Sequence, residues 1–374
     1  MSNIKESTNN KKIFLSGTNG LPGRYGGWDN LLTYLSKKLS LKYKVICHTS
    51  KKDSDFNYKK YAGSDIFYIP LSANGIESIM FDLICLIHAK LESGICILMG
   101  CSGGIFLPIF RLLGLKIILN PDGEEWKRGK WSKPIKLFLF ISFYIGVFSA
   151  NYVVADHPLI LRKVSKIKRK NCFYIPYGGD NALKIAFKKT EEILKNKIEA
   201  QKYLFSVCRI EPENNVHLCL ELCAKTNYKL VFIGNWSNSN YGKELKNKYK
   251  NYDNIFLLDP IYDPRILGSF RSNAKIYFHG HTVGGTNPSL VEAMSLGLNI
   301  IAHDNGFNRH TTGNLAHYFS DYESLEKAFY SAIKKDSVPK ELEELAKERY
   351  LWKDVVGDYE KIVEKAFNMK SAKN

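Results

Sequence analysis

Short apolar runs rich in β-branched and aromatic residues alternate along the chain with longer stretches in which apolar residues recur every three or four positions. In the first half the runs include KIFLSG, YKVICHTS, GICILMG, LKIILNPDG and NYVVAD, and in the second half YLFSVCRI, YKLVFIGN, AKIYFHG and LNIIAHD. Runs of this kind, separated by helical patterns, predict parallel strands covered by helices. We therefore expect an α/β protein.

The polar, lysine-rich stretch 181–201 divides the strand–helix units into two series, and 374 residues are long for a single hydrophobic core. We predict two doubly wound domains, residues 12–185 and residues 200–350. The stretch 351–372 predicts a final amphipathic helix. The longest apolar run, 137–150, is short for a membrane span, so a buried helix is favoured over a segment that dips into a membrane.

The net charge of +17 favours anionic partners, namely nucleic acid, phosphorylated small molecules or an acidic lipid surface. Aromatic residues interleaved on a sheet face are missing and no nucleic-acid motif occurs, which argues against nucleic acid. Basic stretches flank the 137–150 region and favour an anionic membrane surface. The eight cysteines form no CxxC pair and no signal peptide precedes them, so we expect reduced thiols, with Cys219 and Cys223 in the core.

Ligands of doubly wound sheets bind at the carboxyl ends of the strands, and three loops there carry candidate chemistry. The first loop, GTNGLPGRYGGWDN, holds five glycines before a helix but matches neither GxGxxG nor a P-loop. The second loop, VCRIEPENN, places Arg209 at a strand end, where its planar fork could grip a diphosphate. An ion pair with Glu211 or Glu213 is the alternative.

The third loop, HGHTVGGTNPSLVEAMSLG, predicts a helix capped by Asn287, with Pro288 in its first turn. Glu292 is the one charge on this apolar helix, so it needs a partner or water. We expect a diphosphate to rest on the first amides of the helix and Glu292 to accept hydrogen bonds from sugar hydroxyls.

The three loops, together with NPDGEEWKRGKWS, ADHPLIL, YIPYGGD and HDNGFNRHTTG, make the chain resemble GT-B glycosyltransferases of family 4, in the branch that includes bacterial polysaccharide rhamnosyltransferases. The resemblance implies two Rossmann-like domains facing a cleft, with the last helix crossing back to the first domain. It also implies an acceptor on the first domain and a nucleotide-sugar donor on the second. Two departures stand out, because Gly284 replaces the first of two family glutamates and Asn214 replaces a basic residue.

Site roles follow from the motifs and the resemblance together. Asp122, at a strand end, is expected to orient the acceptor hydroxyl, with a turn residue before Gly123 as the alternative. Arg209 and Glu292 join it as catalytic candidates, and Arg24 or Arg309 could add charge for the diphosphate. The donor set is Arg209, Asn214, Gly284, Gly285, Thr286, Asn287, Ser289, Leu290 and Glu292. The acceptor set is Gly20, Arg24, Gly26, Gly27, Asp122 and Glu125, with Glu124 as a further candidate.

The resemblance implies a retaining transfer of L-rhamnose from dTDP-rhamnose to a lipid-linked saccharide, on the inner face of the cell membrane. Fixed cations and amides can stabilise a departing diphosphate, so neither a metal ion nor a cofactor is required. The alternatives are a UDP- or GDP-sugar donor, a nucleotide-sugar epimerase, and a non-catalytic protein that binds nucleotide sugars.

Overall fold

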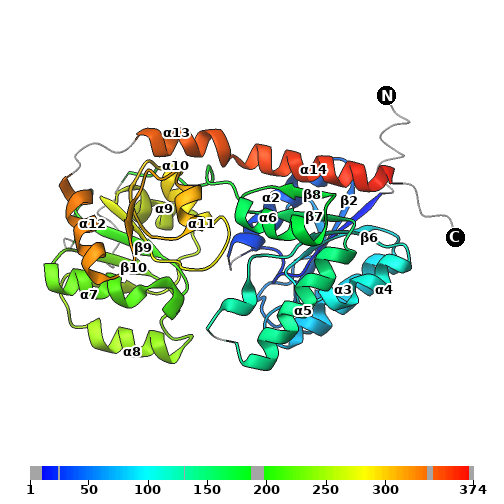
Figure 1. Cartoon of the computed structure of the whole chain (residues 1–374), viewed down its shortest axis with the longest axis horizontal. Coiled ribbons are helices and arrows are strands. Elements are labelled where there is room, and N and C mark those ends of the chain that lie inside the picture. Colours follow the sequence, from blue (N-terminus) through cyan, green and yellow to red (C-terminus); the bar gives the residue numbers. More distant parts are fainter. Residues whose placement is uncertain (1–10, 24–25, 130, 187–197, 335–339, 370–374) are drawn as a thin grey trace. The chain divides into compact units, whose positions relative to one another are not determined.

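The computed structural model describes residues 11–23, 26–129, 131–186, 198–334 and 340–369. The chain forms two compact units, Met1–Tyr177 with Trp352–Asn374, and Gly178–Leu351. Each unit is built around its own parallel sheet (Figure 1).

The first unit contains an eight-stranded sheet in the order β3-β4-β2-β1-β5-β6-β7-β8. Only the short β3 runs antiparallel, beside β4. The strands are β1 (Lys12–Ser16), β2 (Lys44–Ser50), β3 (Lys60–Tyr61), β4 (Ser64–Ile69), β5 (Ile95–Met99), β6 (Lys116–Asn120), β7 (Tyr152–Ala155) and β8 (Cys172–Tyr174). The helices are α2 (Gly27–Leu39), α3 (Glu77–Leu91), α4 (Leu107–Leu112), α5 (Lys133–Ser149), α6 (Pro158–Ile167) and α14 (Trp352–Asn368), with the short 3-10 turns η1 (Gly104–Phe106) and η2 (Glu125–Lys127).

Helix α14 belongs to the first unit although it follows the whole second unit in sequence. It packs against α2, and its apolar side joins the core formed by β1, β2, β5 and α2. Trp352 stacks on Tyr34 with ring centroids 4.1 Å apart, and Asn120 donates a hydrogen bond of 3.1 Å to the Tyr359 hydroxyl. Because parallel crossovers are right-handed, α3, α4 and α5 cover the opposite face of the sheet (Figure 1).

The second unit contains a six-stranded parallel sheet in the order β11-β10-β9-β12-β13-β14. Its strands are β9 (Leu204–Val207), β10 (Leu230–Ile233), β11 (Ile255–Leu258), β12 (Ile276–His279), β13 (Asn299–His303) and β14 (His317–Phe319). Its helices are η4 (Pro212–Asn214), α7 (Val216–Thr226), α8 (Asn240–Tyr249), α9 (Pro264–Ser272), α10 (Pro288–Ser295), α11 (Gly306–Thr311), α12 (Tyr322–Lys334) and α13 (Lys340–Arg349). As predicted, Cys219 and Cys223 are buried in its core.

The two doubly wound sheets confirm the α/β fold class expected from the sequence. The division between the units, however, lies earlier than the predicted linker. Residues 178–185, which the sequence placed in the first domain, lie in the second unit because they are fastened to it. The Gly179 amide donates to the Tyr350 carbonyl at 2.8 Å, and the Ile185 amide donates to the Ser272 hydroxyl at 3.1 Å. Most of the predicted linker, 187–197, lies outside the described residues.

The 137–150 run forms most of α5, as predicted, but the expected buried helix is buried on one side only. Leu137 and Phe148 are 60% and 71% exposed, because α5 covers the sheet with one side only. Among the described residues, no helix is both long enough and apolar enough to cross a membrane.

Candidate nucleotide-sugar site

The loops that follow β9 and β12 are joined by hydrogen bonds. These strands are neighbours at the point where the strand order of the second sheet reverses, which is where doubly wound sheets bind ligands. Both the amide and the hydroxyl of Thr282 donate to the Glu213 carbonyl, at 2.9 and 3.0 Å. The Asn215 side chain donates to the Gly280 carbonyl at 2.9 Å. A Cβ at Gly280 would lie 2.1 Å from the Asn214 carbonyl oxygen, so this close approach requires glycine.

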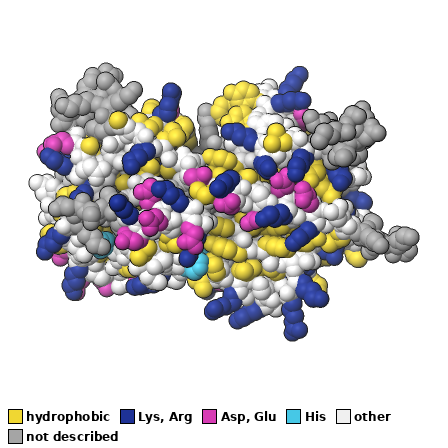
Figure 2. All heavy atoms as spheres, turned by 90° about the horizontal axis from the view of Figure 1, so that it is seen from above, with side chains coloured by type: hydrophobic (Ala, Val, Ile, Leu, Met, Phe, Trp, Pro, Cys, Tyr) yellow, Lys and Arg dark blue, Asp and Glu magenta, His cyan; other side chains and the backbone are white. Residues whose placement is uncertain are grey.

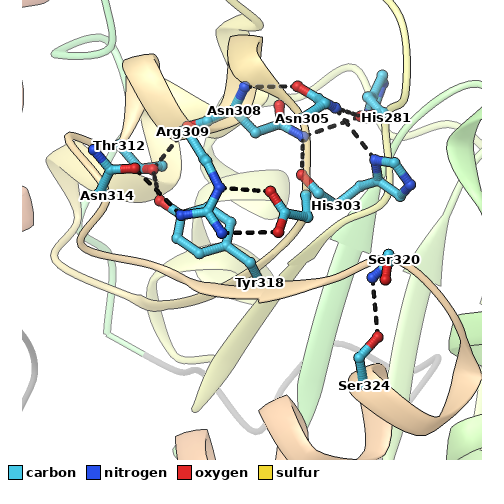
Figure 3. Close-up of polar contacts among 11 residues, drawn as sticks. His281, His303, Asn305, Asn308, Arg309, Thr312, Asn314, Tyr318, Ser320 and Ser324 are labelled. Carbon is cyan, nitrogen blue, oxygen red and sulfur yellow. Dashed lines mark hydrogen bonds and ion pairs between the residues drawn. The ribbon is translucent and has the colours of Figure 1, made fainter.

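Helix α11 fastens the β12 loop from its other side. The side-chain amides of Asn305 and Asn308 both donate to the His281 carbonyl, at 2.9 and 3.0 Å (Figure 3). Asn305 also caps α11, since its carboxamide oxygen accepts from the Asn308 amide. The segment 280–282 is therefore held on both sides and provides a fixed base for the turn that follows.

Arg309, a candidate for diphosphate contact, is already engaged within α11 and its surroundings. Its guanidinium forms a two-point ion pair with Asp304, donates to Asn314 at 3.3 Å, and lies 4.2 Å from the ring centroid of Tyr318 (Figure 3). The hydrogen bond with Arg309 is the main cause that lowers the pKa of Asp304. A diphosphate would have to compete with this carboxylate for Arg309.

The turn before α10 contains most of the predicted donor set. Asn287 caps the helix as expected, because its side-chain oxygen accepts from the Ser289 amide at 3.1 Å and from the Ser289 hydroxyl at 2.8 Å. The Leu290 amide donates to the Asn287 carbonyl at 3.1 Å. Pro288 has no amide hydrogen, so the first amides of the helix are not open for a diphosphate, contrary to expectation. The turn 284–286 is then the part of this loop that could still bind a diphosphate. Gly284 in this turn has a φ of 141°, and a Cβ added to it would meet no atom within 4 Å.

The buried carboxylate of Glu292 has two partners that no local sequence pattern predicts. One carboxylate oxygen lies 2.6 Å from a terminal nitrogen of Arg271 on α9, and the other accepts from the Asn181 side chain at 2.7 Å. Glu292 and Arg271 are only 7% and 5% exposed. An ionised carboxylate offers about four acceptor positions, so a ligand hydroxyl could still be bound beside these two partners. No periodic signal marks Arg271 or Asn181 in the sequence.

Arg209 follows the end of β9 and is exposed. Neither Glu211 nor Glu213 pairs with it, and among the described residues its guanidinium has no ion-pair partner. Asn214 is buried and donates to the Arg209 carbonyl at 2.8 Å, so it holds the loop in place. The contact of Asn214 with a donor stays a prediction. Arg209 thus has the charge that an anionic ligand needs.

Histidines at the ends of β12 and β13 do not add charge at neutral pH. Burial lowers the pKa of His279 to about 3, with a smaller effect from His303. Burial likewise lowers the pKa of His303. His279 stacks on His281 with ring centroids 4.3 Å apart. With His279 and His303 neutral, positive charge at the end of β9 comes from Arg209, which no described carboxylate engages.

In the first unit, the glycines of the predicted acceptor set differ in what requires a glycine at each position. Gly20 has a φ of 94°, and a Cβ there would lie 2.6 Å from the Cα of Thr49, so packing alone explains this glycine. Gly26 has a φ of 102° with no atom within 4 Å of a Cβ added there, and Gly27 begins α2. Arg24 lies outside the described residues.

Asp122 follows β6 with a φ of 65°, a left-handed conformation, and its amide donates to the Asn120 side chain at 3.3 Å. This geometry is that of the turn residue considered as the alternative. Glu125 accepts from the Trp131 indole at 3.0 Å and pairs with Arg128, while Glu124 pairs with Lys127 and Lys163. Both glutamates are therefore charge-compensated, and the acceptor roles of all three residues stay predictions.

Two family models match the sequence, one for each series of strands. Residues 188–349 match the family described as glycosyl transferases group 1. This match covers the second unit from β9 to α13. Residues 10–180 match a family described as a domain of unknown function, DUF1972. None of the curated proteins compared with the chain matches it.

Solved structures with the same fold are glycosyltransferases of the GT-B type, which confirms the GT-B fold expected from the resemblance. A sucrose-phosphate synthase from Thermosynechococcus elongatus is 13% identical with a TM-score of 0.80, over 96% of this chain and 99% of that chain. HepE from Anabaena in complex with UDP is 13% identical with a TM-score of 0.69, over 95% and 100%. The starch synthase IV catalytic domain from Arabidopsis thaliana, bound to ADP and acarbose, is 13% identical with a TM-score of 0.70, over 96% and 100%. At these identities the similarity shows the fold.

Proposed function

We propose that this protein is a retaining glycosyltransferase that moves L-rhamnose from dTDP-rhamnose to a lipid-linked saccharide during cell-surface polysaccharide assembly. The group 1 glycosyltransferase domain and the GT-B fold support the transfer of a sugar from a nucleotide donor. The rhamnose donor, the acceptor and the location at the inner face of the cell membrane rest on the sequence motifs.

The observation that supports the donor site most directly is the exposed Arg209, whose guanidinium pairs with no described carboxylate and whose loop is hydrogen-bonded to the β12 loop. In this proposal the donor diphosphate binds between Arg209 and the turn 284–286. Glu292, one turn into α10, accepts hydrogen bonds from hydroxyls of the nucleotide sugar. The fixed positions of Arg271 and Asn181 keep its carboxylate oriented before the donor arrives.

In the proposed reaction, the bond between the sugar and the diphosphate breaks and negative charge builds on the departing diphosphate. Arg209 stabilises this charge without reorganisation, since its loop is held by Asn214. The acceptor hydroxyl attacks from the same face, and the leaving phosphate takes its proton. Asp122 orients that hydroxyl. No residue of the chain is required to form a covalent intermediate.

A thermal-shift panel of nucleotide sugars tests the donor assignment, because a ligand that binds the native state raises its melting temperature. We expect dTDP-rhamnose to give the largest shift, and transfer to a lipid-linked saccharide to follow in a product assay. A larger shift with a UDP- or GDP-sugar would identify that nucleotide sugar, and not dTDP-rhamnose, as the donor. Conversion of the donor without an acceptor would indicate an epimerase, and binding without any turnover would indicate a non-catalytic protein.

Substitution of Arg209 tests the site itself. Arg209→Ala removes a charge-assisted contact worth roughly 1.5–3 kcal/mol, so donor affinity should fall about tenfold or more. The matched control is Arg265→Ala, since Arg265 is an exposed arginine of the same unit that pairs with Asp263. Calorimetric titration of both variants measures the effect, and equal donor affinities in the two would remove Arg209 from the site.

Asp122→Asn separates the acceptor role from the donor role. It keeps the shape of the turn but removes the charge, so we expect slower transfer with donor affinity nearly unchanged. Transfer at the wild-type rate would make Asp122 only a turn former. A loss of donor binding would place it on the donor side.

A further inference from the structure

The helical layer formed by α3, α4 and α5 is apolar on its outer side as well as on the side that faces the sheet. Helices that cover a sheet commonly present polar residues to solvent. Here the large hydrophobic side chains exposed on the layer recur at helical spacing, so each helix carries an outward stripe. The stripes are Ile76, Met80, Ile87 and Leu91 at α3, Ile105, Ile109, Leu112 and Leu113 at α4, and Leu137, Phe140, Ile141 and Phe148 on α5.

The three stripes belong to one continuous layer (Figure 1). The Ser102 hydroxyl, in the loop before α4, donates to Asp82 of α3 at 2.8 Å. Arg111 of α4 donates to the Ser149 carbonyl of α5 at 3.2 Å. More than half of the exposed large hydrophobic side chains among the described residues lie on this layer. Exposed apolar area of such extent on a soluble unit commonly marks an interaction surface.

Positive charge is in excess around α5. Residues 126–179 contain eleven lysines and arginines and one acidic residue, Asp156. Glu124 and Glu125, just before this segment, neutralise three of the cations, Lys127, Arg128 and Lys163. The Lys168 ammonium donates to the Phe148 carbonyl at 3.3 Å, so a cation lies directly beside the exposed end of the α5 stripe. By contrast, acidic and basic side chains are mixed on the side of the first unit that bears α14, where Lys361 pairs with Asp358 (Figure 2).

We propose that the outer side of the α3–α4–α5 layer is a docking surface for an anionic lipid bilayer. The exposed leucine, isoleucine and phenylalanine side chains enter the boundary between headgroups and acyl chains, and the adjoining lysines and arginines bind lipid phosphates. A second copy of the chain is a poor occupant, because it would bring the same positive charge against this surface. The proposal rests on the proposed function for the location at the inner face of the cell membrane, and it adds the surface that binds the lipid there.

Vesicle flotation of the full chain tests the docking surface, without nucleotide sugar or saccharide acceptor. We expect binding to vesicles that contain phosphatidylglycerol, at least tenfold stronger than binding to phosphatidylcholine alone. Binding should weaken between about 50 and about 500 mM salt, because the Debye length shrinks from above roughly 10 Å to a few ångströms. Equal binding to both vesicle types, or none to either, would overturn the proposal.

Two sets of variants locate the surface. Leu137→Ser/Ile141→Ser/Phe148→Ser removes most of the α5 stripe, and Lys133→Glu/Lys136→Glu inverts the charge at the start of α5. We expect each set to lower vesicle binding at least tenfold with an unchanged melting temperature, since the residues changed in the stripe are exposed. The matched control, Leu41→Ser/Tyr330→Ser, changes exposed side chains away from this layer and should bind as the wild type does.

Any outcome in which the α5 variants bind vesicles as well as the control does would overturn the proposal. Sedimentation in the absence of lipid tests the alternative that the layer binds a second copy of the chain. If the wild type self-associates and the α5 variants are monomeric without a change in vesicle binding, the layer is a protein interface. Because the vesicles contain neither donor nor acceptor, failure here leaves the glycosyltransferase proposal untouched, and failure of transfer leaves docking untouched.

Discussion

Glu292 and Arg271 show how a single buried ion pair constrains a site. Both side chains are withdrawn from water, and each supplies the counter-charge of the other. Breaking a buried pair costs far more than replacing both members by apolar residues, because one charge is then left uncompensated. The pair therefore fixes the Glu292 carboxylate in place whether or not a donor is bound.

Arg271→Met should destabilise the second unit by about 3–5 kcal/mol, since Glu292 would lose its buried counter-charge. The double variant Arg271→Met/Glu292→Leu should recover most of this loss. Arg265→Met is the control, because Arg265 lies on the same helix and its pair with Asp263 is exposed, so the change should stay below about 1 kcal/mol. Urea unfolding of the four proteins measures these differences, and a double variant no more stable than Arg271→Met would contradict the account.

His279 gives a pH dependence of stability with a definite sign. Burial lowers its pKa to about 3 in the folded chain, against about 6.5 when unfolded. The unfolded chain thus binds one more proton between these values, so stability is fully present above about pH 6.5 and is lost as the pH falls. The slope from one such histidine is about 1.4 kcal/mol per pH unit.

His279→Asn should therefore reduce the proton uptake on unfolding at about pH 5 by about one proton. His48, whose pKa burial also lowers to about 3, remains in the first unit and keeps part of the wild-type uptake. Potentiometry during urea unfolding measures the difference. An uptake that equals that of the wild type would mean that His279 is already protonated in the folded chain.

At the scale of elements, two glycines allow the effect of backbone strain on stability to be measured without any steric clash. At neither Gly26, before α2, nor Gly357, within α14, would an added Cβ meet an atom within 4 Å. Gly26 has a φ of 102°, a conformation that side chains rarely adopt, whereas Gly357 has a helical backbone. Any difference between their alanine variants therefore comes from the backbone.

Gly357→Ala should stabilise the first unit by about 1 kcal/mol, since alanine favours the interior of a helix. Gly26→Ala should destabilise it by roughly 1–3 kcal/mol through strain alone, since its φ of 102° and ψ of −176° lie in a region essentially confined to glycine. Thermal or urea unfolding provides the comparison, and the same sign for both variants would show that φ at Gly26 does not govern the effect.

For the whole molecule, α14 makes the first unit discontinuous in sequence. Its residues from Trp352 to Ala366 contribute to the core of β1, β2, β5 and α2, and the second unit lies entirely within 178–351. A core that loses a helix exposes apolar surface and leaves cavities, each costing several kcal/mol.

A chain that ends at residue 351 should consequently lose the fold of the first unit and keep that of the second. Limited proteolysis should degrade residues up to about 177 and leave a resistant fragment that begins near 178. Near-ultraviolet circular dichroism should in parallel lose the signal of aromatic residues that stay in the truncated first unit, such as the buried Tyr152 and Tyr177. Survival of both units after truncation would show that α14 is dispensable for folding.

Local sequence patterns determined much of the architecture. Alternating apolar runs and helical periods predicted the two parallel sheets, because a covered strand must be apolar on both faces. The N-cap at Asn287, the burial of Cys219 and Cys223, and the helix over 137–150 were predicted for the same reason, since each depends on neighbours within a few residues.

Tertiary structure decided the rest, because those features depend on how loops and helices pack and not on a local pattern. The pairing of Glu292 with Arg271 and Asn181 depends on where α9 and the 178–186 segment pack, and no local pattern records it. The engagement of Arg309 by Asp304, and the absence of a described carboxylate partner for Arg209, follow from loop conformation. Apolar periodicity likewise cannot distinguish the two sides of α5, which is apolar on both. Only the sheet beneath it shows that Leu137 and Phe148 point outward.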